Sequence, residues 1–137
     1  MVEPENEITV TAAEVSDYAR ITGLVVPALR EVVERKVTVT AARKAGIGVS
    51  MGELQKAADY FRFAKGFSKA KDTKDWLKSN AISIEALEEH LETNLFISKF
   101  RDYLLEEASR SKTLALPGGA ESSDDKIYRD WLEKQFK

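Results

Sequence analysis

The chain has 137 residues, of which 43% are hydrophobic and 32% are charged. This length suits one compact domain, and the composition is that of a folded protein rather than a disordered or fibrous one. The 21 basic and 23 acidic side chains leave a net charge of −2, so charge gives no general reason to expect nucleic acid or anionic membrane as a partner. The absence of cysteine excludes disulfides and thiolate metal sites, and a single histidine excludes a multi-histidine metal site.

The N-terminal segment, Met1 to Glu7, carries three glutamates and a proline. A secretory signal peptide would instead begin with basic residues and continue with an apolar run. The sequence also holds no apolar stretch of the roughly 20 residues that a membrane-spanning helix needs. We therefore expect a cytoplasmic protein with no membrane insertion.

Two helices are expected in the first third of the chain. Thr11 followed three residues later by Glu14 forms a capping box, which predicts a helix over 12–22 that ends at Gly23. A second helix is expected over 24–45, before Gly46. A short β-prone piece, residues 8–10, precedes the first of these helices.

One stretch of the second helix also carries a strand pattern. Residues 37–40, Val-Thr-Val-Thr, alternate like a strand, whereas Leu29, Val33, Val37 and Ala41 recur at helical spacing. We favour the helix, because the surrounding residues are good helix formers and the alternation is too short for an isolated strand.

Three further helices are expected in the middle of the chain. Ser50 and Glu53 form a second capping box, which predicts a helix that ends at Gly66. Asp72 is expected to cap a short helix over 73–80. Ser83 is expected to cap the longest helix, over 84–109, which carries an apolar stripe.

The last part of the chain changes character. Residues 110–124 are rich in Ser, Gly, Lys and acidic residues, which is typical of a flexible linker. Residues 125–137 return to a helical pattern, with an apolar side formed by Ile127, Trp131, Leu132 and Phe136. The sequence thus predicts an all-α fold of about six helices, in which the closing helix 125–137 packs back on the N-terminal helices and forms one domain with residues 1–109.

The chain carries no phosphate-binding loop, dinucleotide fingerprint, zinc-protease motif or nucleophile elbow. His90 lies among Glu85, Glu88, Glu89 and Glu92, which is typical of a solvated acidic helix face; a general base or a metal ligand is the alternative. Basic and aromatic residues alternate over 62–78, a pattern that lysines around core aromatics, an acidic peptide site or nucleic-acid binding can each produce. We expect no catalytic residue, no cofactor, no metal and no nucleic-acid partner.

The surplus of large aromatic side chains is more informative. Most must lie in the core, but an apolar groove between helices can receive an amphipathic or extended peptide. Phe63, Phe67 and Phe96 lie off or at the edge of the inward stripe of their helices, so we expect them to be exposed peptide contacts. The candidate peptide-binding set is completed by Phe100 and Tyr103.

Several spaced segments carry a family resemblance. They are 53–55 (Glu-Leu-Gln), 57–62 (Ala-Ala-Asp-Tyr-Phe-Arg), 72–77 (Asp-Thr-Lys-Asp-Trp-Leu), 82–85 (Ile-Ser-Ile-Glu), 91–95 (Leu-Glu-Thr-Asn-Leu) and Lys99. Together they resemble the N-terminal domain of SurA-type peptidyl-prolyl isomerases, which belong to the parvulin class and are PpiC-like. The cyanobacterial-style branch without a signal peptide is the more similar one, and the resemblance covers about residues 8–105.

The resemblance implies a helical domain with chaperone-type binding of unfolded polypeptide. In that family a parvulin domain, inserted before a closing helix, carries the isomerase activity. Here 127–135 resembles the closing helix, and the linker stands where the parvulin domain is expected. The resemblance therefore implies a non-catalytic chaperone domain that holds unfolded or leader polypeptides. A dedicated adaptor in peptide maturation or export is the second hypothesis, and an isomerase with residual activity is the third; the sequence predicts neither the client nor the oligomeric state.

Overall fold

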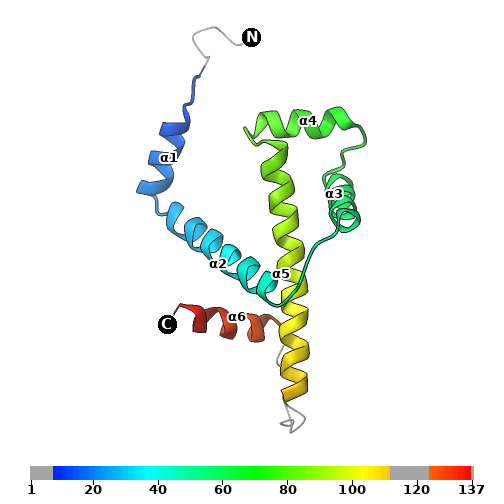
Figure 1. Cartoon of the computed structure of the whole chain (residues 1–137). Coiled ribbons are helices and arrows are strands. Elements are labelled where there is room, and N and C mark those ends of the chain that lie inside the picture. The colour runs from blue at the N-terminus through cyan, green and yellow to red at the C-terminus, as the bar shows by residue number, and fades with distance from the viewer. Residues whose placement is uncertain (1–7, 112–123, 137) are drawn as a thin grey trace. The chain divides into compact units, whose positions relative to one another are not determined.

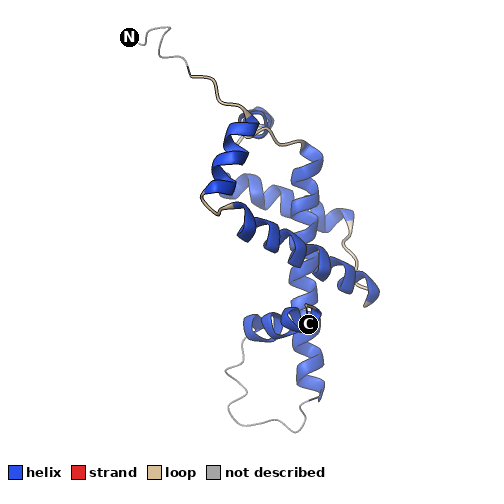
Figure 2. Cartoon of the chain, turned by 90° about the vertical axis from the view of Figure 1, so that its left-hand side faces the viewer, coloured by secondary structure: helices blue, strands red, loops and turns tan. Residues whose placement is uncertain are grey.

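The computed structural model describes residues 8–111 and 124–136. These residues form six α-helices, without a strand in either described range (Figure 2). The predicted all-α class is confirmed, and residues 37–40 are helical, as favoured. The chain divides into two compact units between Glu34 and Arg35, within the second helix.

The first unit holds α1 (Ala12–Ile21) and the first half of α2 (Val25–Lys44). The predicted capping box is present, since Thr11 Oγ1 accepts the Glu14 backbone N–H and Glu14 Oε1 accepts the Thr11 N–H. These bonds satisfy two of the N–H groups that a helix start leaves without a partner. Gly23, in the turn between the helices, has φ of 79°, a conformation that glycine adopts without strain.

The second unit continues with α3 (Met51–Lys65), α4 (Ala70–Ser79), α5 (Ile84–Ser111) and α6 (Asp124–Gln135). The capping box of Ser50 and Glu53 is confirmed, and Gly66 ends α3 with φ of 77°. Ser83 Oγ accepts the Ala86 N–H at the start of α5, as predicted.

The predicted start of α4 is wrong by three residues. Asp72 does not cap the helix; it lies in the first turn, where its carboxylate accepts the backbone N–H groups of Ser68 and Lys69. An acidic residue near a helix start can be the N-cap or can lie in the first turn. Here it lies in the first turn, so the helix begins one turn earlier than expected.

The expected linker, 110–124, lies largely outside the described residues, which exclude 112–123. Both ends of that range are helical, because α5 continues through Ser111 and α6 begins at Asp124.

The long helix α5 organises the second unit and contributes to two apolar cores (Figure 1). Near its N-terminus, Leu87 and Leu91 pack with Leu77 of α4 and with side chains of α3. Further along, Phe96 and Phe100 pack with Ala42 of α2 and with α6. This second core lies beneath the candidate site described below.

The closing helix α6 packs against α5, as predicted. Trp131 meets the Phe100 ring edge-on, with the ring centres 4.7 Å apart, and Leu132 is buried. Arg101 pairs with Asp125, and the Tyr128 hydroxyl bonds to Thr38 Oγ1 of α2 at 2.7 Å. A helix of this length is marginal in water alone, so these contacts account for its order. Phe136 is about half exposed, which corrects the expectation that it belongs to the packed side.

Candidate functional site

A groove with a volume of about 760 Å³ runs between three helices of the second unit. Its walls come from the second half of α2, from the C-terminal half of α5 and from α6. We name it the α2–α5–α6 groove. The lining side chains are Lys36, Val37, Thr40, Ala41, Lys44, Ala45, Phe100, Tyr103, Leu104, Glu107, Trp131 and Gln135.

Aromatic side chains form much of the groove wall. Phe100 is 3% exposed and stacks on Tyr103, with the ring centres 5.6 Å apart. Trp131 closes the groove from α6 through its contact with Phe100. Because α6 is bonded to both α5 and α2, this wall is held in place, and the groove combines an apolar floor with a defined shape.

The α2 and α5 sides of the groove rim differ in the charges that they leave available for a ligand. Lys36 and Lys44 lie eight residues apart on α2, just over two helical turns, and both side chains are exposed. Neither ammonium makes an ion pair within the described ranges 8–111 and 124–136. On the facing helix, Glu107 is already paired with Arg110 at 3.1 Å. The α2 side of the groove therefore offers two available positive charges.

The five sequence-predicted peptide contacts do not form one site. Phe100 and Tyr103 line the groove. Phe96 does not, and the expectation that it is exposed is wrong: its ring is 4% exposed and lies in the core, with the Arg43 guanidinium 4.9 Å from its centre. Phe96 lies next to the inward stripe of α5 and faces α2. The periodicity of α5 alone does not reveal that α2 covers this position.

The two remaining predicted contacts lie elsewhere. Phe63 is 81% exposed on α3, as expected, but is not part of the groove. Phe67 is half-buried in an aromatic cluster, 6.3 Å from the ring centres of both Phe61 and Trp76. This cluster covers the core between α3, α4 and α5, so Phe67 packs within the fold.

Several groove residues were not among the sequence candidates. Val37 and Ala41 had been assigned only to a helical stripe, and Trp131 only to the packed side of the last helix. Lys36 and Lys44 gave no signal beyond their charge. The four-residue spacing from Lys36 through Thr40 to Lys44 would have placed them on one side of α2.

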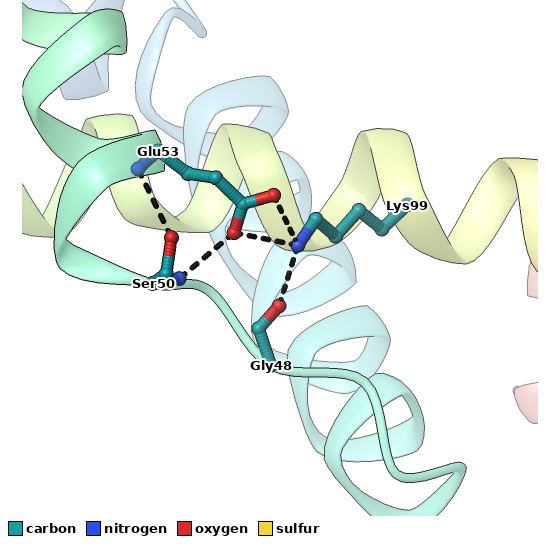
Figure 3. A network of polar contacts seen from close by, with 4 residues as sticks. All are labelled: Gly48, Ser50, Glu53 and Lys99. Atoms are coloured by element: carbon teal, nitrogen blue, oxygen red, sulfur yellow. Dashed lines mark hydrogen bonds and ion pairs between the residues drawn. The ribbon is translucent and has the colours of Figure 1, made fainter.

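An ionic network of the second unit ties α5 to the start of α3 and to the loop before it (Figure 3). Lys99 Nζ lies 2.6 Å from the Glu53 carboxylate and donates to the Gly48 carbonyl oxygen at 2.7 Å. The bond from Lys99, with the backbone N–H of Ser50, lowers the pKa of Glu53 from 4.5 to about 2. Both charged groups in this network have partners. The network therefore stabilises the fold and offers no reactive group.

His90 contacts an arginine rather than the surrounding glutamates. The Arg35 guanidinium lies 3.3 Å from His90 Nδ1 and donates to the His90 carbonyl oxygen and to Asn94 Oδ1. Partial burial and the positive charge of Arg35 lower the pKa of His90. The neutral imidazole is thus favoured, and its Nδ1 is used in holding α2 to α5.

Two searches of the described residues bear on other classes of site. No group of three or more His, Cys, Asp or Glu side chains in that part of the chain could hold a metal ion. None of its helices is both long and apolar enough to cross a lipid bilayer.

Comparisons with family models, with curated proteins and with solved structures find no match to the chain. The resemblance to the N-terminal domain of SurA-type isomerases therefore stays a prediction.

Proposed function

We propose that the chain is a non-catalytic, chaperone-type domain that binds unfolded or leader polypeptides in the α2–α5–α6 groove. The observation that carries the proposal is the groove itself, an apolar hollow of about 760 Å³ with Phe100, Tyr103 and Trp131 in its wall. Pockets of this size, with apolar walls and a few polar groups, are typical binding sites. Grooves between helices commonly receive the apolar side of an amphipathic peptide.

The rim charges specify the ligand further. Lys36 and Lys44 attract a segment that carries acidic residues beside its apolar ones. Such fixed charges also support the second hypothesis, a dedicated adaptor that recognises one acidic and apolar partner, because complementary charge favours one partner over others. A chaperone would bind many unrelated unfolded proteins through the same groove, whereas an adaptor would bind one.

The binding test compares two tyrosines. Tyr103 lines the groove, whereas Tyr60 is 72% exposed on α3 and is not part of it. We expect Tyr103→Ala to raise the Kd for fluorescently labelled unfolded clients about tenfold, since aromatic contacts often dominate peptide interfaces. Tyr60→Ala, the matched control, should leave the Kd unchanged. Titrations of several unrelated clients distinguish the chaperone from the adaptor.

A second variant protects the test against loss of folding. Lys36 and Lys44 are exposed, so the double variant Lys36→Glu, Lys44→Glu leaves the core intact, and it should weaken binding of an acidic client more than binding of a basic one. The groove is the wrong site if neither this variant nor Tyr103→Ala weakens binding. The same holds if Phe63→Ala does so instead.

A further inference from the structure

The first unit concentrates exposed apolar side chains. Ten of the sixteen exposed large hydrophobic residues found in the described part of the chain lie between Ile8 and Val33, with exposed fractions from 38% to 84%. None of residues 8–34 is buried. Monomeric proteins rarely leave large apolar surfaces uncovered.

On each helix these side chains fall on one side. At 100° per residue, the five positions on α2 lie within about 120° of arc, and the three positions on α1 lie within the same angle. The α2 positions are opposite Glu31 and Glu34. We name this set the N-terminal apolar face: Val15, Tyr18, Ile21, Val25, Val26, Leu29, Val32 and Val33.

Local interactions do not account for the order of these helices. The capping box of α1 contributes about 1 kcal/mol in typical cases, and α1 has 10 residues. Helices shorter than about 12 residues are marginal in water unless an apolar side is covered. The N-terminal apolar face therefore requires a cover.

We infer that the N-terminal apolar face is the contact surface for a second copy of this chain. Its area fits: seven exposed side chains and the half-buried Val25, at roughly 60 Å² each, give about 500 Å² of apolar surface. Because apolar atoms make up about 60% of an interface, this corresponds to roughly 800 Å² per copy, the amount that a stable dimer of standard size buries.

The charges of this unit agree with self-association. Asp17 lies 4.0 Å from Arg20, Arg30 lies 3.5 Å from Glu34, and Glu14 is used in the capping box. Both arginines of the unit are thus paired within one copy, so the partner need not supply acidic groups for them. Four acidic residues against two basic ones between Ile8 and Glu34 also give no attraction to an anionic lipid surface.

A two-fold dimer also fits the geometry of two short amphipathic helices. In a two-fold dimer the same surface of each copy contacts the other. Two such helices from each copy give a four-helix arrangement, in which every apolar side faces a common interior.

The test measures the mass of the full chain by light scattering over a dilution series. Interfaces of this area reach Kd values of about 1 µM or tighter, so we expect a dimer at tens of micromolar. Leu29→Glu places a charge at the centre of the face, at a side chain that is 58% exposed, and should raise the dimer Kd about 100-fold or more. Phe63→Glu makes a comparable change at an exposed helical position of α3 and should leave the dimer intact.

Far-UV circular dichroism, which reports on the helices of both units, should show that the variants stay folded; tryptophan fluorescence, from Trp76 and Trp131, reports on the second unit alone. A full chain that stays monomeric at all these concentrations overturns the inference, as does a dimer that Leu29→Glu leaves intact. If the monomeric chain instead binds an unfolded client and Leu29→Glu weakens that binding, the face is a client surface and the inference is wrong.

Discussion

Lys99 links three parts of the second unit through one ammonium group. It bonds the Glu53 carboxylate on α3 and the Gly48 carbonyl in the preceding loop, while its own backbone belongs to α5. Glu53 in turn closes the capping box with Ser50. One carboxylate therefore serves both the start of α3 and the packing of α3 on α5.

This network predicts a pH dependence of stability. Because the folded state lowers the pKa of Glu53 from 4.5 to about 2, the stabilisation is fully present above pH 4.5 and is lost as the pH falls toward 2. Glu53→Gln should therefore lower the free energy of unfolding at neutral pH, and the difference from the unmodified chain should shrink across that interval. Urea unfolding at a series of pH values measures it.

The control for this pH dependence is Glu106→Gln, at an exposed position of α5 outside the network. The difference in the free energy of unfolding between Glu106→Gln and the unmodified chain should not show the change with pH that is expected for Glu53→Gln. Lys99→Met should remove most of the dependence that Glu53 contributes, because the bond from Lys99 is the largest cause of the lowered pKa. A gap between Glu53→Gln and the unmodified chain that stays constant down to about pH 2 would contradict the assignment.

At the residue scale, the sequence predicts contacts that are local and fails for those that are not. The capping boxes at Thr11 and Ser50 were predictable because donor and acceptor lie three residues apart. The partner of Lys99 lies 46 residues away, and Arg35 meets His90 across 55 residues. No local spacing encodes such pairs, so glutamates near His90 in sequence suggested a different environment from the one that Arg35 provides.

At the element scale, α6 is positioned by polar contacts as well as by its apolar side. Arg101 pairs with Asp125 and lies over the Tyr128 ring, 5.2 Å from its centre. Thr38, which is fully buried on α2, bonds the Tyr128 hydroxyl. The sequence predicted that this helix packs back on the N-terminal helices, because an exposed apolar side is costly, but it did not predict the polar contacts that hold it.

The Thr38–Tyr128 bond gives a prediction for how α6 is held. Thr38→Val should lower the free energy of unfolding by about 1–2 kcal/mol, because the partner hydroxyl loses its bond in a partly buried place. Tyr128→Phe should lower it by about 1 kcal/mol. The two effects should not add, and a double-mutant cycle measured by urea unfolding should give a coupling of about 1 kcal/mol.

Thr40→Val supplies the matched control for that cycle. The Thr40 hydroxyl bonds the Lys36 carbonyl within α2 and does not reach α6. Its coupling to Tyr128→Phe should be close to zero. Equal couplings for Thr38 and Thr40 would mean that the Thr38–Tyr128 bond does not help to hold α6.

At the scale of the whole molecule, burial is divided unequally between the two units. Every buried side chain of the described part lies at or after Thr38, in the cores around α5. The first unit has regular helices and caps but no buried residue. The sequence suggested one domain because 137 residues suit one compact core. Periodicity reports which side of a helix is apolar but not whether anything covers that side.

The last prediction follows from this division. A chain that lacks residues 1–34 keeps both cores, the α2–α5–α6 groove and the Lys99 network. At concentrations where the full chain is monomeric, the midpoint of its urea unfolding, followed by tryptophan fluorescence, should match that of the full chain. At tens of micromolar the helices of residues 8–34, followed by far-UV circular dichroism, should unfold at higher urea than under dilute conditions, because dimerisation favours the folded state of the unit that forms the contact. A shortened chain that unfolds at lower urea even under dilute conditions would show that the first unit stabilises the second within one copy. A shortened chain that still dimerises would place the contact between copies outside the N-terminal apolar face.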